Sequence, residues 1–294
     1  MLQSWMDRQA TLTALAGRQL FFVAGAPRSG TTWLQHLLDA HPEVCCRGEG
    51  LFQQQVVKPL DAMVGLWRQA LAEKNANIFR HSGGYKLPED DDADQLIGTA
   101  ILGALARQCG GQEFRAVGEK TPENVFLFPR LKRLFPRAKL ICIARDPRDV
   151  LSSAWHFFPR PAADREAPAA KVAFIRSALP SLEQGARVTL ALAERHAEDC
   201  AVVTYEGLLA APEPIAARLF RFLGVSGSDD IVAACVARTS FAALAGGRPA
   251  GVLQEGSFFR RGVAGDWRAT LTPEMNAIIL EALGWSFPAF GWEP

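Results

Sequence analysis

Four short runs of apolar residues predict the strands of a buried sheet. Their apolar positions are continuous and do not alternate with polar ones, which is typical of a strand covered on both faces. We expect these strands near 20–24, 115–118, 138–144 and 201–204. Because helical periodicity fills the intervals between them, the sequence predicts an α/β fold with a parallel β-sheet and helices on both faces.

The same pattern predicts where the helices lie. We expect them at 1–17, 31–40, 51–77, 91–108, 169–196, from 205 to about 224, and 271–285. Pro180 is a point at which the helix over 169–196 could break. The connection around 79–86 is either a loop on the acceptor side of a site or a plain surface connection.

The composition is typical of an ordinary globular protein. The 294 residues are 49% hydrophobic and 21% charged, and no repeat or linker divides them. We therefore expect one domain over 1–294. The net charge of +1 argues against a general nucleic-acid binder, which would carry a basic excess. Any phosphate binding must then be local.

The cysteine spacing and the hydropathy of the chain bear on metal binding and on cellular location. The six cysteines show no C-x-x-C spacing, so free thiols are expected in place of disulfides or zinc ligands, and no metal site is predicted. No run of eighteen apolar residues predicts a membrane span, and Asp7 and Arg8 interrupt the first segment where a signal peptide needs an apolar core. The expected location is cytoplasmic.

The stretch from Phe21 to Leu34 joins an apolar strand, a glycine-containing turn and an amphipathic helix. Backbone N–H groups at the start of a helix lack intrahelical partners and hold anions well. The Gly25-x4-Gly30 frame has Walker A spacing, but Thr31 stands where that motif has lysine. This disfavours an ordinary P-loop NTPase and leaves Arg28 as the cation of the loop.

The segment Pro27–Trp33 resembles the phosphosulfate-binding loop of sulfotransferases that use 3′-phosphoadenosine 5′-phosphosulfate (PAPS), which reads P-K-S-G-T-T-W in cytosolic members. The resemblance implies a P-loop-like nucleotide-binding fold, PAPS as donor and adenosine 3′,5′-bisphosphate (PAP) as product. It assigns Arg28, Ser29, Gly30, Thr31 and Thr32 to the 5′-phosphate. It also implies that Trp33 stacks on adenine, although a tryptophan at this spacing is also typical of core packing.

Two further segments resemble the 3′-phosphate site of the same family. One runs from Arg145 to Ser153, where Pro147 and Asp149 suit the first turn of a helix, and it implies Arg145 and Ser153 as phosphate ligands. The other, 258–268, is similar to the pattern R-K-G-x-x-G-D-W-K. Adjacent arginines beside a glycine suit a phosphate, because guanidinium groups donate in a fork. This second segment contributes Phe259, Arg260, Arg261 and Gly262.

Two more matches concern the adenine. Tyr205 begins a Tyr-Glu-Gly-Leu stretch that looks like the family's Y-E-D-L, in which the tyrosine lies near the base. Thr239 and Phe241 stand in a Thr-Ser-Phe sequence that matches the family segment bordering adenine.

The resemblance also implies the catalytic residues. Glu49, between two glycines, matches the catalytic base of tyrosylprotein and heparan sulfotransferases, though an exposed loop glutamate is usually only a solvated charge. Lys120 lies in a Glu-Lys-Thr-Pro segment similar to one near the transferring group, and Pro122 stands where cytosolic members have a histidine base. The competing candidates for the base are Glu119 and His156.

The implied reaction is in-line transfer of a sulfuryl group from PAPS to an acceptor hydroxyl, or less often an amine, with Glu49 as base and with Arg28 and Lys120 stabilising charge. The acceptor could be a small molecule, a carbohydrate or a peptide. A P-loop kinase and a catalytically idle nucleotide-binding module are the alternatives, and the oligomeric state stays open. Aromatic residues that could line an acceptor pocket, or pack in the core, are Phe52, Trp67, Tyr85, Trp155, Phe157 and Phe158.

Overall fold

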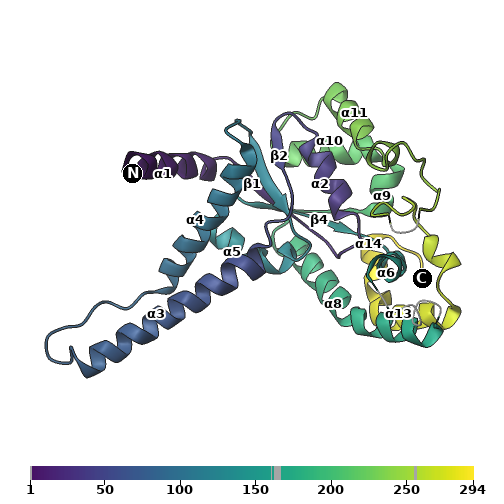
Figure 1. Cartoon of the computed structure of the whole chain (residues 1–294). Helices are drawn as coiled ribbons and strands as arrows, with labels where there is room; N and C mark the ends of the chain where they lie inside the picture. The colour runs from purple at the N-terminus through teal and green to yellow at the C-terminus, as the bar shows by residue number, and fades with distance from the viewer. Residues whose placement is uncertain (1, 160, 162–166, 255–256) are drawn as a thin grey trace.

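The computed structural model describes residues 2–159, 161, 167–254 and 257–294 (Figure 1). Its centre is a sheet of five parallel strands in the order β2-β3-β1-β4-β5. The strands are β1 Gln19–Ala24, β2 Val44–Cys46, β3 Ala116–Lys120, β4 Lys139–Ala144 and β5 Cys200–Thr204. The four predicted strands are confirmed, and the edge strand β2 is one that the sequence pattern did not predict.

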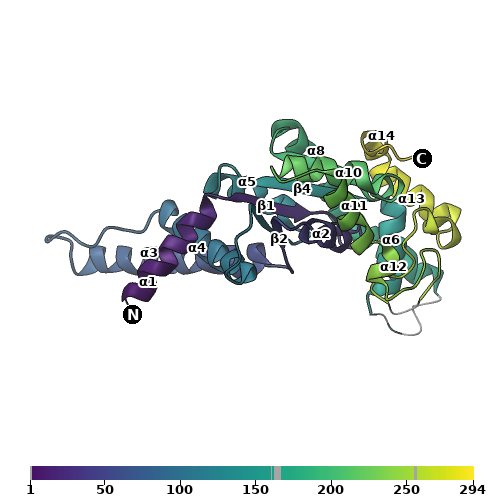
Figure 2. The ribbon, with the colours of Figure 1, turned by 90° about the horizontal axis from the view of Figure 1, so that it is seen from above.

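Alternate residues of each strand enter two separate cores, as the pleat of a strand requires. Phe22 and Val117 pack on one face against α1 (Leu2–Ala16), α4 (Asp90–Cys109) and α5 (Asn124–Leu134). Phe21 and Val23 pack on the other face against α2, α9, α10 and α11. These four helices span Thr31–Asp39, Tyr205–Ala210, Pro212–Phe222 and Asp229–Arg238. The predicted arrangement, helices on both faces of a parallel sheet, is therefore confirmed (Figure 2).

A third core lies beside the sheet, beyond β4. It joins α6 (Pro147–Phe157), α8 (Pro168–Arg195), α13 (Pro273–Leu283) and α14 (Phe287–Phe290). Helix α8 continues through Pro180, where a break was possible. Ile175 and Leu179 before the proline are buried in this core, and Leu182 after it packs against the same core, so packing holds the helix on both sides of the missing N–H. Thr272 caps α13 by accepting a hydrogen bond from the N–H of Met275 at 3.3 Å.

Helices α3 (Lys58–Asn77) and α4 form an arm that projects from the body, after a π-helical turn at Gln53–Val57 (Figures 1 and 2). The connection around 79–86 is at the far end of this arm, well away from α2, so its interpretation as an acceptor-side loop is wrong. Trp67 and Tyr85 are exposed on the arm and do not line a pocket near the sheet.

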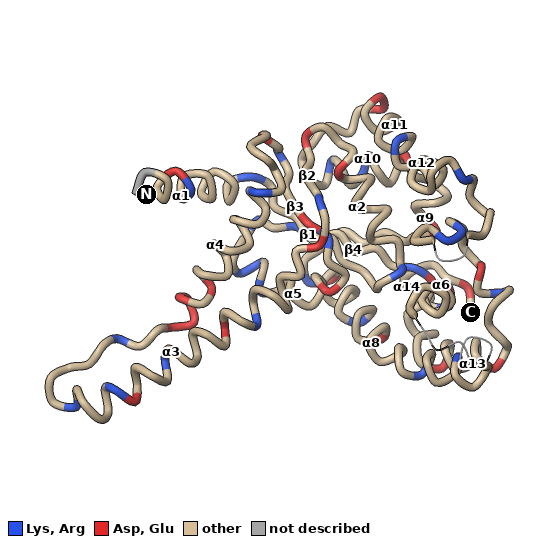
Figure 3. Tube along the Cα trace, in the orientation of Figure 1, with Lys and Arg blue, Asp and Glu red and all other residues tan. Residues whose placement is uncertain are grey.

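The remaining elements are α12 (Phe241–Leu244) and the 3₁₀ turns Asp266–Ala269 and Gly284–Ser286. Basic and acidic residues are interspersed over the chain, with an acidic group at the start of α4 (Figure 3). The six cysteines are free and buried, as predicted. Within the described residues, every helix is too short or too polar to cross a membrane.

Candidate active site

The loop between β1 and α2 lies at the carboxyl end of the central strand, where ligands of open parallel sheets bind. Three of its residues have positive φ: Gly25 at 155°, Arg28 at 73° and Gly30 at 97°. A Cβ on Gly30 would lie 2.7 Å from Cδ2 of Tyr205, so this position needs glycine. Among the described residues, no side chain caps the N-terminus of α2 at Gly30, which leaves the first N–H groups of the helix open to an anion.

The hydroxyl of Ser29 is buried inside this loop. Ser29 is 0% exposed, and its Oγ makes no hydrogen bond with any described residue. Buried polar atoms are nearly always paired in folded proteins. An oxyanion bound in the loop would supply the missing partner.

A cavity opens from the loop toward α6, α9 and the segment after α12. Of the fifteen residues predicted to bind the donor, thirteen line it. They are Arg28, Gly30, Thr31, Thr32, Trp33, Arg145, Ser153, Tyr205, Phe241, Phe259, Arg260, Arg261 and Gly262. The other two, Ser29 and Thr239, lie outside the lining. Four arginines therefore face one cavity, and this concentration of positive charge suits a polyanion.

Arg28 connects the loop to the far side of this cavity. Its Nε donates to Oγ of Ser153 at 3.3 Å, and its Nη2 donates to the carbonyl of Phe258 at 2.8 Å. The guanidinium lies over the ring of Phe157, 4.0 Å from the centroid. Burial, together with Arg145 and Arg260, lowers the pKa of Arg28 to about 10, so it remains a cation at neutral pH.

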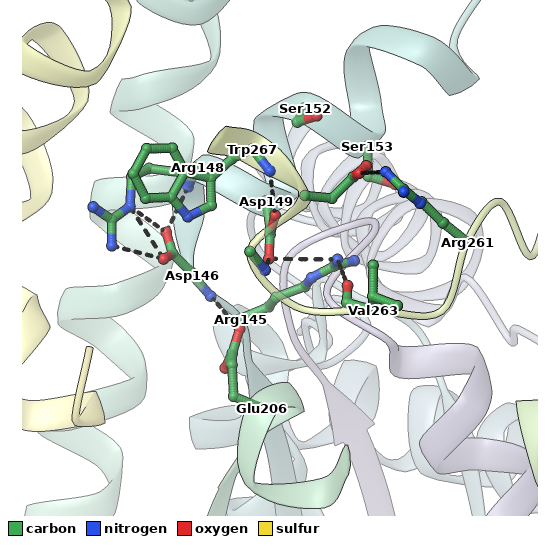
Figure 4. A network of polar contacts seen from close by, with 12 residues as sticks. Arg145, Asp146, Arg148, Asp149, Ser152, Ser153, Glu206, Arg261, Val263 and Trp267 are labelled. Atoms are coloured by element: carbon green, nitrogen blue, oxygen red, sulfur yellow. Dashed lines mark hydrogen bonds and ion pairs between the residues drawn. The ribbon is translucent and has the colours of Figure 1, made fainter. Parts of the chain in front are cut away.

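Arg145 occupies the junction of β4 and α6 (Figure 4). Its Nη2 donates to the carbonyl of Val263 at 3.0 Å and lies 3.7 Å from Oδ2 of Asp149. The guanidinium also lies over the Tyr205 ring at 4.2 Å. The predicted partner Ser153 is in the second turn of α6 and, like Arg145, lines the cavity.

The segment after α12 closes the cavity. Gly262 has a φ of 68°, and a Cβ there would lie 2.1 Å from Cδ2 of Phe241, so only glycine lets these two predicted residues meet. The side chains of Arg260 and Arg261 both pair with the carboxylate of Asp266. The structure thus brings together the two segments predicted to form a 3′-phosphate site.

The opposite end of the cavity is aromatic. The indole of Trp33 donates from Nε1 to the carbonyl of Thr239 at 2.9 Å and meets the Tyr205 ring edge-on, with centroids 5.6 Å apart. Thr239 itself is buried, and its hydroxyl donates to the carbonyl of Cys235. Thr239 therefore holds Trp33 through its backbone, which differs from direct contact with a base.

Of the three predicted catalytic residues, Arg28 lines this cavity, whereas Glu49 and Lys120 form a second cluster outside its lining. Glu49, in the loop after β2, makes a salt bridge with Lys120 at the end of β3. Lys120 is almost fully buried, whereas the Glu49 side chain is 42% exposed. In the sheet, Lys120 of β3 is paired with Val23 of β1, and Val23 is two residues before Gly25. The Glu49–Lys120 pair therefore adjoins the start of the phosphate loop.

Two hydrogen bonds from the residues after Glu49 attach its loop to the end of β3. The N–H of Gly50 donates to Oε2 of Glu119 at 3.0 Å, and the N–H of Leu51 donates to Oγ1 of Thr121 at 3.2 Å. Glu119 is buried and also accepts from Asn124, and burial raises its pKa. His156 is exposed at the end of α6, with Nδ1 2.8 Å from the carbonyl oxygen of Ser152. Glu119 therefore acts as a structural anchor, and Glu49 is the accessible carboxylate.

Sequence reasoning missed several residues of the site. Asp149 and Asp266 lie inside the two matched motifs, but Asp149 was assigned only to the first turn of a helix and Asp266 was given no role. Phe157 was predicted to line an acceptor pocket or to pack in the core, and in the structure it encloses Arg28 together with Phe258. Arg248 has no motif to mark it, although its guanidinium binds the carbonyls of Phe259 and Arg260.

Comparisons with known proteins agree with this geometry. Residues 21–230 match the model of the sulfotransferase family. Protein-tyrosine sulfotransferase 2 of Gallus gallus is 30% identical over 220 residues, which cover 72% of this chain and 53% of that protein. Nodulation protein NoeE of Sinorhizobium fredii is 26% identical over 295 residues, covering 90% of this chain and 63% of that protein. The chain thus spans between half and two thirds of the length of these curated relatives.

Solved structures share the fold. Mouse sulfotransferase SULT7A1, solved with PAP, superposes with a TM-score of 0.57 at 17% identity, covering 95% of this chain and 89% of that one. The sulfotransferase domain of the Synechococcus PCC 7002 olefin synthase gives a TM-score of 0.57 at 19% identity, with 94% and 95% coverage.

Proposed function

This chain belongs to the sulfotransferase family, and we propose that its arginine-lined cavity binds PAPS. We further propose that the enzyme transfers the sulfuryl group to the hydroxyl of an acceptor that lies beside Glu49. By family the chain is a PAPS-dependent sulfotransferase, and the alternatives of a P-loop kinase and an idle nucleotide-binding module are not favoured. What is proposed here is which residues carry the reaction and which kind of acceptor it takes.

The observation that carries the proposal is the meeting of two anion sites in one cavity. The first is the loop at the N-terminus of α2, whose residues Gly30, Thr31 and Thr32 line the cavity. The second combines Arg145 and Ser153 of the β4–α6 junction with Arg260 and Arg261. A nucleotide with a 5′-phosphosulfate and a 3′-phosphate carries two anionic groups on one ribose, and it matches two anion sites in one cavity.

The residues then divide the chemical work. PAPS, when bound, supplies an activated sulfuryl group. Glu49 removes the proton of the acceptor hydroxyl, so that the acceptor oxygen forms a bond to sulfur as the bond from sulfur to the phosphate oxygen breaks. Lys120 stabilises negative charge on the sulfuryl oxygens, and Arg28 with the N–H groups of the loop stabilises the phosphate that leaves.

The acceptor class is proposed from the relatives and from the aromatic residues beside Arg28. The relatives include proteins named for protein tyrosine, and we propose a phenolic hydroxyl on a peptide or a small molecule as the acceptor. Phe157 and Phe158 at the end of α6 are exposed next to Arg28 and would contact an aromatic acceptor. Phe52 and Trp155 are buried, so we do not assign them to an acceptor pocket.

Donor binding tests the proposal directly. We expect PAP and PAPS to bind much more tightly than adenosine 5′-phosphosulfate, which lacks the 3′-phosphate, and we expect EDTA to have no effect. One charged hydrogen bond contributes about 1.5–3 kcal/mol, so Arg145→Ala should weaken PAP binding by roughly ten- to a hundredfold. Calorimetry is the measurement, and equal affinity for PAPS and adenosine 5′-phosphosulfate would contradict the assignment.

A further inference from the structure

Asp266 is a buried carboxylate in the wall of the donor cavity that no motif assignment explains. Its side chain is 3% exposed, and it lines the cavity with the arginines. One oxygen, Oδ2, accepts from Nη2 of Arg260, and the other, Oδ1, accepts from Nη1 of Arg261. Each carboxylate oxygen thus serves one arginine.

The backbone around Asp266 is fixed independently of these two ion pairs. Asp149, buried in the first turn of α6, accepts from the N–H of Gly265 at 2.7 Å and from the N–H of Trp267 at 2.9 Å. These hydrogen bonds hold the residues on both sides of Asp266 against α6 (Figure 4). Asp266 therefore presents its two oxygens to the cavity from a rigid position.

Each arginine keeps donors to spare after pairing with Asp266. Arg261 uses Nη1 for Asp266 and Nε for the carbonyl of Gly251, which leaves Nη2. Arg260 uses Nη2 for Asp266, and its Nε and Nη1 make no hydrogen bond with the described part of the chain. A guanidinium has five N–H donors in a planar fork, so it can bind Asp266 and a phosphate at the same time.

From this geometry we propose that Asp266 is a positioning residue for the 3′-phosphate: it orients Arg260 and Arg261 so that their free donors point to the phosphate, and it offsets part of the mutual repulsion of the cavity's arginines. The inference rests on the proposed function, because it takes the 3′-phosphate of PAPS as the ligand. It assigns a role in donor selection to an acidic residue, which by charge alone would repel that ligand.

Asp266→Asn tests the role with little change of shape. Asparagine has one acceptor oxygen, so its amide N–H₂ would face one of the two guanidinium groups and release it. We expect PAP to bind about tenfold more weakly or worse, while adenosine 5′-monophosphate, which has no 3′-phosphate, binds within about twofold of its wild-type affinity. The readout is the ratio of these two affinities, measured by calorimetry on the full chain.

Two controls separate positioning from general damage. Asp230→Asn makes the same charge change at an exposed site on α11 and should leave both affinities unchanged. In a double-mutant cycle, Asp266→Asn should cost less than about threefold once Arg260 is alanine, because only Arg261 then needs an acceptor and the one amide oxygen of asparagine can supply it. A purely structural Asp266 would lower both affinities together, or lower only the thermal stability, and would leave their ratio intact.

The outcomes distinguish this inference from the proposed function. Wild-type protein that binds PAP and adenosine 5′-monophosphate equally would contradict the proposed 3′-phosphate site itself. Wild-type protein that prefers PAP, with the same preference in Asp266→Asn, would overturn the positioning role alone. Tighter binding of PAP by Asp266→Asn would also overturn it, because Asp266 would then compete with the phosphate.

Discussion

Glu49 and Lys120 meet although one follows β2 and the other ends β3. The parallel pairing of these two strands brings both to the same edge of the sheet, and hydrogen bonds to Glu119 and Thr121 hold the Glu49 loop there. Glu49 is partly exposed, whereas Glu119 already accepts three hydrogen bonds from protein groups. A base needs an open lone pair, and this favours Glu49.

Glu49→Gln should therefore lower turnover by about 10²–10⁴-fold and leave PAP affinity nearly unchanged, because the amide keeps the size of the side chain but not its basicity. Single-turnover rates at saturating PAPS measure this. His156→Asn is the control and should retain its rate. A near-normal rate in Glu49→Gln beside a collapsed rate in His156→Asn would mean that the base is misassigned.

Gly262 is a second residue whose identity follows from its surroundings. Gly262→Ala should weaken PAP binding by roughly tenfold, because the new methyl group would displace the Phe241 ring from the cavity wall. Gly224, after α10, has a φ of 72° but open space around it and lies outside the cavity lining, so Gly224→Ala is a matched control for backbone strain. We expect both variants to lose about 1–2 kcal/mol of stability, and only Gly262→Ala to lose PAP affinity as well. Equal PAP affinity in the two variants would contradict the packing argument.

At the scale of elements, ion pairs fasten the arm to the body. Asp94 of α4 accepts from Nε of Arg130 at 2.9 Å and from Nε of Arg133 at 2.7 Å, both on α5. Arg130 also binds Asp61 of α3. These three helices are thus joined at the base of the arm by a network centred on α5. The hydrogen bonds of Arg133 and Arg130 lower the pKa of Asp94.

Asp94→Asn should lower the free energy of unfolding at pH 7 by about 1–3 kcal/mol, the range of charged hydrogen bonds. A carboxylate whose pKa is lowered by folding stabilises the protein above its unfolded pKa, and this contribution is lost as the pH falls through the folded value. The difference between wild type and variant should therefore be constant from pH 7 to pH 5 and shrink below the ordinary value of 3.8. Urea unfolding at pH 7, 5 and 3 measures it, and an equal difference at pH 3 would contradict the ionic origin.

For the whole molecule, the arm and the donor cavity are separate structures. The cavity is built from elements at the carboxyl ends of the strands, whereas α3 and the outer half of α4 extend away from them (Figure 1). Along α3, Val64 is 3% exposed and Leu66 is 69% exposed. Substitutions at these two positions can therefore test whether packing of the arm affects ligand binding in the cavity.

We expect Val64→Ala to cost about 1.5–3 kcal/mol of stability, since it removes a buried side chain, and Leu66→Ala to stay within about 0.5 kcal/mol. PAP affinity should be unchanged in both variants, because neither residue contacts the cavity wall. Chemical denaturation and calorimetry measure the two properties. A loss of PAP affinity in Val64→Ala would show that the arm and the cavity are coupled.

The sequence by itself determined the features that depend on neighbouring residues. Buried strands, helix starts at Thr31 and Pro147, and the two phosphate segments follow from short apolar runs and from capping and loop chemistry. The short strand β2 and helix α5 escaped prediction, since three residues are too few for a pattern and α5 contains Pro129.

Only the tertiary structure decided which side chains meet. The contact of Arg28 with Ser153 spans 125 positions of the chain, and that of the Gly265 N–H with Asp149 spans 116. Such contacts depend on the order of the strands in the sheet and on the packing of the helices, and the local sequence does not predict either of them. For this reason the arginines of the site could be read from motifs, whereas the acidic partners that orient and anchor them, Asp149 and Asp266, became visible only in the folded chain.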